Sequence, residues 1–125
     1  MSAQQQLGLK SRTGDAAGAR KAVVEDGADV NAACFDGHNG AMGGTCTATF
    51  VAARRGHTGV LGVLLAAPVS ADPDKGDARD GETPCGAACR GNHPDAVALL
   101  LAHGADPNLV DEDGWTPCML SLIHI

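Results

Sequence analysis

The chain has 125 residues, a formal net charge of −6, 44% hydrophobic residues and only 2% aromatic residues. This length allows one domain with a modest core. The scarcity of aromatic residues disfavours a β-sandwich, whose strands prefer aromatic and β-branched side chains, so the core must come from Leu, Val and Ala. Lys and Arg total nine and are scattered. A phosphate backbone would meet mostly negative charge, and we expect no nucleic-acid partner.

The compartment is indicated by what the sequence lacks. No apolar run approaches the roughly 20 residues that cross a bilayer, so we expect no membrane association. The N-terminal residues lack the apolar core of a secretory signal. Five cysteines, an odd number without framework spacing, favour free thiols in a reducing compartment. We expect a cytoplasmic protein, with the nucleus as the alternative.

The first third of the sequence contains one recognisable helix. Residues 1–10 predict a polar lead-in, and residues 11–33 a divergent unit with a helix from Ala16 to Glu25. The first helix of that unit would have to come from residues 5–12, where the pattern is weak. Residues 34–46 are rich in glycine and predict a loop insertion.

The second unit covers residues 47–76. It opens with Thr47-Ala48-Thr49-Phe50, and its second helix has an apolar face spaced for an α-helix. The members of this face are Val60, Leu61, Leu64 and Leu65.

The third unit, residues 77–110, contains the clearest repeat. Its Gly81-Glu82-Thr83-Pro84 returns as Gly114-Trp115-Thr116-Pro117, 33 residues later. A fixed period of this length, with Thr-Pro opening each unit, resembles the ankyrin repeat. The second unit departs from this family, which has Thr-Pro-Leu-His where this sequence has residues 47–50. Residues 111–125 then begin a truncated fourth unit.

The resemblance implies an all-α solenoid of antiparallel helix pairs joined by β-turn finger loops. It also implies a non-catalytic scaffold that binds a partner protein through the finger loops and the concave helix face. We expect a monomer without cofactors. The alternative is a targeting or regulatory ankyrin segment of a longer enzyme or membrane protein. A third hypothesis is that the protein is a decaying gene product without a stable fold.

The resemblance also implies which residues contact the partner, because finger tips and the exposed faces of first helices form the concave surface. Carried over by position, these residues are Arg54, Arg55, Arg79, Asp80, Glu82, Arg90, Glu112, Asp113 and Trp115. Trp115 has two readings, a partner anchor or a cover for the neighbouring finger. Asn31 and Asn108 end turns like those in which ankyrin asparagines are hydroxylated in some proteins, and are candidate modification sites.

Other chemistry is less well supported. Cys85, Cys89 and His93 recur at helical spacing, but a zinc site needs about four converging ligands, and packed thiols explain these positions better. The glycines of residues 40–44 lack the closing Gly-Lys-Ser/Thr of a phosphate loop. Residues 72–77 lack the final glutamate of a calcium loop. We expect no catalytic set and no metal.

The last six residues, Leu120 to Ile125, contain neither the Ala-Ala step nor the capping helix expected of a further unit. They back-translate to a transposase end sequence used in making sequencing libraries. Our hypothesis is that some or all of them derive from adapter sequence, so that the protein is a fragment.

Overall fold

The computed structural model describes residues 3–32, 46–66, 69–76, 81–107 and 109. Over these residues it contains three helix pairs and no strand. The first pair is α1 (Ala3–Thr13) and α2 (Ala16–Val24). The second is α3 (Ala48–Arg55) and α4 (Thr58–Leu65), and the third is α5 (Pro84–Arg90) and α6 (Pro94–Ala102).

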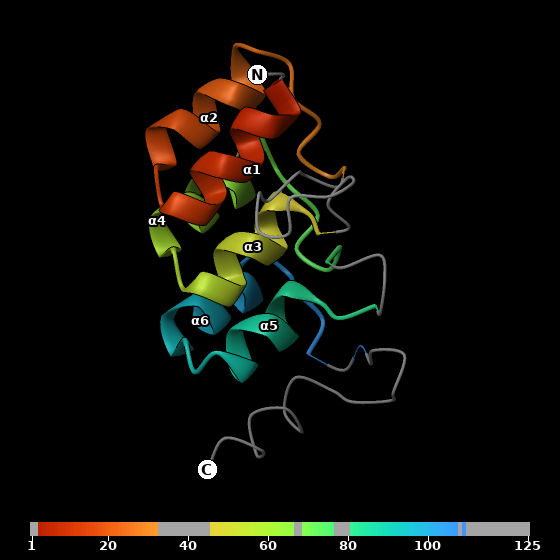
Figure 1. The fold of residues 1–125 in the computed structure, drawn as a ribbon. Coiled ribbons are helices and arrows are strands. Elements are labelled where there is room, and N and C mark those ends of the chain that lie inside the picture. Colours follow the sequence, from red (N-terminus) through yellow and green to blue (C-terminus); the bar gives the residue numbers. More distant parts are fainter. Residues whose placement is uncertain (1–2, 33–45, 67–68, 77–80, 108, 110–125) are drawn as a thin grey trace.

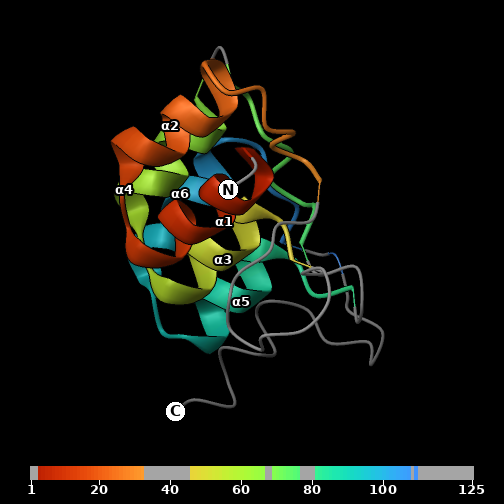
Figure 2. The same ribbon diagram turned by 45° about the horizontal axis from the view of Figure 1, so that its top comes forward.

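The three pairs stack into two layers. The first helices, α1, α3 and α5, form one layer, and the second helices, α2, α4 and α6, form the other (Figure 1). Within each layer a helix contacts its neighbour, and across the layers it contacts the helix of its own pair. The view turned by 45° shows the same order (Figure 2). The predicted all-α solenoid is confirmed.

Threonine hydroxyl groups cap the first helices of the second and third units. Thr47 and Thr83 take extended backbone conformations, and their hydroxyl oxygens accept the N–H groups of Phe50 and Gly86. These bonds satisfy N–H groups that have no partner inside the helix. The second unit therefore begins like the third although Ala48 replaces the proline, because the cap depends on threonine.

The polar lead-in expected over residues 1–10 is instead part of α1, which begins at Ala3. Its Leu7 and Ser11 are fully buried. The side chain of Gln4 is tied to the turn after α2, because its Nε2 donates to the Asp29 carbonyl and its Oε1 accepts from the Asp29 N–H. The local apolar pattern is weak because Leu7 is the one large apolar residue of α1 that is fully buried. Packing against α2 and α3 stabilises the helix.

The core lies between the two layers and is almost entirely aliphatic. Its largest fully buried side chains include Leu7, Leu61, Leu64 and Leu100. Alanines such as Ala52 and Ala88 fill the positions where helices approach most closely. Leu101 of α6, by contrast, is 42% exposed. Among the described residues, α6 has α4 on one side within its layer and no helix on the other.

Candidate functional site

An arginine occupies the same position in all three units. The turn after each first helix contains a residue in the left-handed region: Gly14 (φ +85°), Gly56 (φ +73°) and Asn92 (φ +59°). Two residues before each of them stand Arg12, Arg54 and Arg90. We call these three residues the arginine row. Sequence reasoning selected Arg54 and Arg90 but missed Arg12, whose signal was the same two-residue spacing to a glycine.

Contacts between units bring the ends of the first helices together. The Nε2 atom of His57, which follows α3, lies 2.9 Å from the carbonyl oxygen of Arg12 at the end of α1. A Cβ added to Gly91, which follows α5, would lie 3.0 Å from the carbonyl oxygen of Arg54. The last turns of α1, α3 and α5 therefore lie side by side.

The surroundings hold two of the three arginines in place. The guanidinium carbon of Arg54 lies 5.6 Å from the centre of the Phe50 ring, within the range of a cation–π contact. Nη1 of Arg90 lies 3.2 Å from Oε2 of Glu82. Arg90 itself is exposed, so its charge faces solvent.

Glu82 does not belong to the exposed surface on which it was expected. It was predicted on the exposed surface, but it is only 4% exposed, and its carboxylate is turned toward Arg90. The residue directly before a threonine cap lies against the start of its helix, which places the side chain among packed atoms. Glu82 therefore orients Arg90 and offers little surface to a partner.

The remaining predicted contacts divide into two groups. Arg55 lies beside the arginine row and is partly exposed, and the Nε atoms of Arg12 and Arg55 are buried and make no hydrogen bond within the described part of the protein. Six other predicted residues lie outside the described residues: Arg79, Asp80, Asn108, Glu112, Asp113 and Trp115.

The turns that leave α2, α4 and α6 form a second linear feature. Asn31 donates its N–H to Asp29, and its side-chain oxygen accepts the N–H of Asp72 at 2.7 Å. Asp72 accepts from the N–H of Asp74, which accepts from the N–H of Asp106 at 2.8 Å. Two of these hydrogen bonds thus connect the three units, and the other two lie within single turns. The acidic side chains of this edge are used to join turns.

A family model of ankyrin repeats, in three copies, matches residues 49–124. The chain belongs to the ankyrin-repeat family. The match begins inside α3, yet the α1–α2 pair continues both layers of the same stack. The ankyrin architecture therefore extends toward the N-terminus beyond the matched residues.

One curated relative is the zinc finger CCCH domain-containing protein 67 of Oryza sativa subsp. japonica. It is 43% identical to this protein over 68 residues, which is 52% of the chain. The chain spans only 11% of the length of that relative. The likeness concerns a small part of the larger protein.

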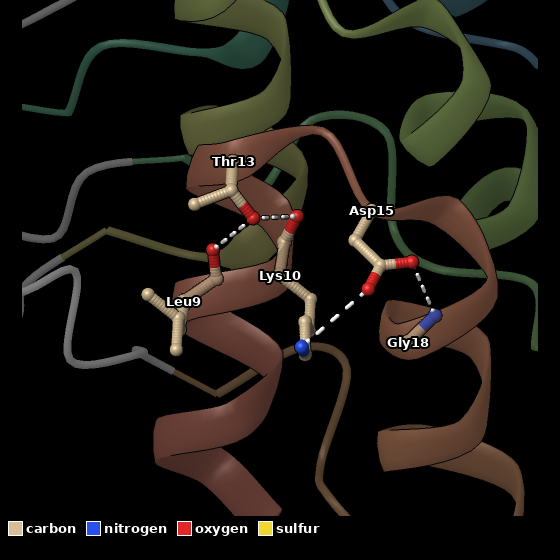
Figure 3. Close-up of polar contacts among 5 residues, drawn as sticks. All are labelled: Leu9, Lys10, Thr13, Asp15 and Gly18. Carbon is tan, nitrogen blue, oxygen red and sulfur yellow. Dashed lines mark hydrogen bonds and ion pairs between the residues drawn. The ribbon is translucent and has the colours of Figure 1, made fainter.

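The N-terminal ankyrin unit carries a polar hollow of about 600 Å³ between α1 and α2. Two ion pairs line it, Lys10 with Asp15 at 3.4 Å and Lys21 with Asp26 at 3.6 Å. The Gly18 N–H and the Lys10 ammonium lower the pKa of Asp15, against an opposing effect of desolvation (Figure 3). These charges are already matched, so the hollow has no excess charge to attract an ion.

The cysteines of the third ankyrin unit are packed thiols. Cys85 is 1% exposed, and burial, followed by the neighbouring Cys89, raises its pKa to about 12. A thiol with this pKa stays protonated near neutral pH. Within the residues that the structure describes, no three His, Cys, Asp or Glu side chains converge as a metal site. Over the same residues, no helix is both long and apolar enough to span a bilayer.

Proposed function

We propose that this protein is a non-catalytic module that binds a partner protein across the last turns of α1, α3 and α5. Ankyrin repeats are generally protein–protein interaction modules, and this protein has their architecture. The observation that carries the proposal is the arginine row, because stacking turns one arginine per unit into a continuous line of charge. Arg55 widens this line at its centre.

The finger residues predicted from the sequence extend the proposed surface. Arg79, Asp80, Glu112, Asp113 and Trp115 are proposed contacts by position in the ankyrin repeat. Trp115 is the strongest anchor among them, since tryptophan contributes disproportionately to interfaces.

Site-specific photo-crosslinking tests the proposed surface. A photoreactive amino acid replaces Arg55 in one variant of the full-length protein and Arg20 in another. Arg20 is an exposed residue of α2, in the opposite layer, and serves as the matched control. We expect a partner protein to be captured from position 55 and not from position 20. Equal capture from both positions, or none from either, would contradict the proposal.

A second candidate is that the same surface acts within a longer protein, as its targeting or regulatory segment. The observation that favours it is the rice relative, of which the chain spans 11%. By analogy with the name of that relative, we propose a zinc finger CCCH domain elsewhere in the longer protein. Sequencing the source transcript across the codon for Met119 and onward tests this. A stop codon directly after Ile125, with no finger upstream, would reject it.

Asn31 is a proposed modification site. Its backbone N–H and side-chain oxygen hold it within the series of linked turns, next to Asp29. Hydroxylation by a modifying enzyme would insert one atom of O₂ into a C–H bond of the asparagine, while a reducing co-substrate converts the other atom to water. Mass spectrometry of protein from its native source would show one added oxygen on Asn31, and an unmodified peptide would reject the assignment.

A further inference from the structure

We propose that the arginine row binds an acidic peptide in polyproline II conformation, with carboxylates at every third residue. This rests on the proposed function, because it names the partner chemistry for the same surface. The property of the ligand that we predict is the spacing of its carboxylates. That spacing depends on the positions of Arg12, Arg54 and Arg90.

The spacing follows from how helices pack. Neighbouring packed helices lie about 8–10 Å apart, so arginines at equivalent positions of α1, α3 and α5 recur at about that interval. A polyproline II helix has three residues per turn and rises about 3.1 Å per residue. Its side chains therefore return to one face about every 9.3 Å. A β-strand does not fit, because residues three apart point to opposite faces.

The charge distribution favours carboxylates over a dense polyanion. The protein as a whole has a net charge of −6, so a nucleic acid would be repelled at long range. At short range the row presents Arg12, Arg54 and Arg90, with Arg55 beside them. Glu82, which is paired with Arg90, is buried, and half of the Arg90 side chain remains exposed. A peptide with three spaced carboxylates carries less charge than a nucleic acid, so it is repelled less at long range and can still pair with the row at short range.

Two arginines are partly ordered before any ligand binds. Arg54 lies over the Phe50 ring, and Arg90 is held by Glu82. Ordering in advance reduces the side-chain entropy that binding would remove. Guanidinium groups bind carboxylates in a planar, two-bonded arrangement, which an ammonium does not provide. We therefore expect arginine, and not positive charge alone, to matter.

Fluorescence anisotropy with two labelled peptides tests the spacing. The first peptide has nine residues, with glutamate at the first, fourth and seventh positions and proline and serine elsewhere. The second has the same composition with its three glutamates adjacent. We expect the full-length protein to bind the spaced peptide about tenfold more tightly, with an affinity that falls as salt rises.

Variants of the full-length protein connect binding to the row. Arg54→Gln combined with Arg90→Gln removes the preference for the spaced peptide, whereas Arg20→Gln, the matched control on α2, leaves it unchanged. Arg54→Lys combined with Arg90→Lys keeps the charge and loses most of the preference. Circular dichroism shows whether each variant retains the fold. If the glutamine double variant unfolds, the lysine double variant still tests whether the preference depends on the arginines.

Three outcomes would overturn the inference. Equal binding of the two peptides, or an equal loss from Arg20→Gln, would show general electrostatic attraction. An RNA oligonucleotide that displaces the spaced peptide at lower concentration would reassign the row to nucleic acid. Absence of peptide binding, with crosslinking from position 55 intact, would reject acidic recognition and leave the proposed function standing. Failure of both experiments would reject both proposals.

Discussion

The second helix of the middle ankyrin unit and those of the outer two units differ in how completely they are buried. In α4 the buried residues are Val60, Leu61, Leu64 and Leu65. In α6, by contrast, only Ala96 and Leu100 are buried, and in α2 only Ala19 and Ala22. Each unit of a solenoid contacts only its neighbours. Among the described residues, α4 has both α2 and α6 beside it in its layer, whereas α2 and α6 each have only α4. The loss in the free energy of unfolding that each substitution causes should follow this difference.

The largest effect should come from truncating a leucine of the middle unit. Leu64→Ala removes a fully buried side chain, and we expect a loss of about 2–5 kcal/mol in the free energy of unfolding. Leu101→Ala, at a residue of the same type that is 42% exposed, should change it by no more than about 0.5 kcal/mol. Urea unfolding of both variants measures the contrast. Equal losses would break the comparison between the middle and outer units.

The next prediction compares two glycine positions, one that is restricted by its backbone conformation alone and one that is also crowded by a neighbouring unit. A Cβ on Gly56 would lie 2.5 Å from Nδ1 of His93 in the third unit, at a φ of +73°. Gly27 has a similar φ of +79° and nothing within 4 Å. Gly27→Ala should cost about 1–2 kcal/mol from the left-handed conformation alone. Gly56→Ala should cost about 1–3 kcal/mol more, because the histidine must move.

Thermal unfolding of the two glycine variants provides the measurement. The difference between them reports contact between the second and third units. Similar melting temperatures would show that the His93 ring moves aside freely, and that this interface is loosely packed.

A smaller effect is expected at the cap of the middle unit. Thr47→Ala removes the hydroxyl that accepts the Phe50 N–H and donates to the Lys75 carbonyl at 2.7 Å. We expect a loss of about 0.5–2 kcal/mol. Thr47→Ser keeps the hydroxyl and should retain most of this stability. Chemical denaturation compares the two, and an equal loss in both would assign the role to the threonine methyl group.

The smallest effect belongs to the exposed N-terminal unit and depends on pH. The Gly18 N–H and Lys10 hold the pKa of Asp15 below its ordinary value (Figure 3). The native state therefore favours the carboxylate, and this stabilisation is present above the ordinary pKa of about 3.9 and lost as pH falls through the lowered value. Asp15→Asn can still cap α2 but should lose this acid dependence.

NMR titration of the Asp15 carboxyl group checks this prediction directly. Lys10→Gln should raise the pKa of Asp15 only in part, because the Gly18 N–H is the larger cause. An unshifted pKa in the wild-type protein would contradict the arrangement of Figure 3.

The sequence predicted the repeat because its signals are local. The Thr-Pro opening of the third unit and the apolar spacing of α4 are both read from a few neighbouring residues. The helix α1 was assigned in part to a lead-in because its local pattern is weak. Its burial depends on contacts with α2 and α3, which no local pattern contains.

By itself the sequence determined the second and third helix pairs, the period and the ankyrin family, since apolar spacing and the Thr-Pro repeat are patterns of the chain itself. Only the tertiary structure decided which charges are available. Stacking aligned Arg12 with Arg54 and Arg90, and packing buried Glu82 against the row instead of exposing it. The physical reason is that alignment depends on which unit lies alongside, since the arginines of adjacent units are 42 and 36 residues apart in the sequence, and that exposure depends on how each side chain is packed.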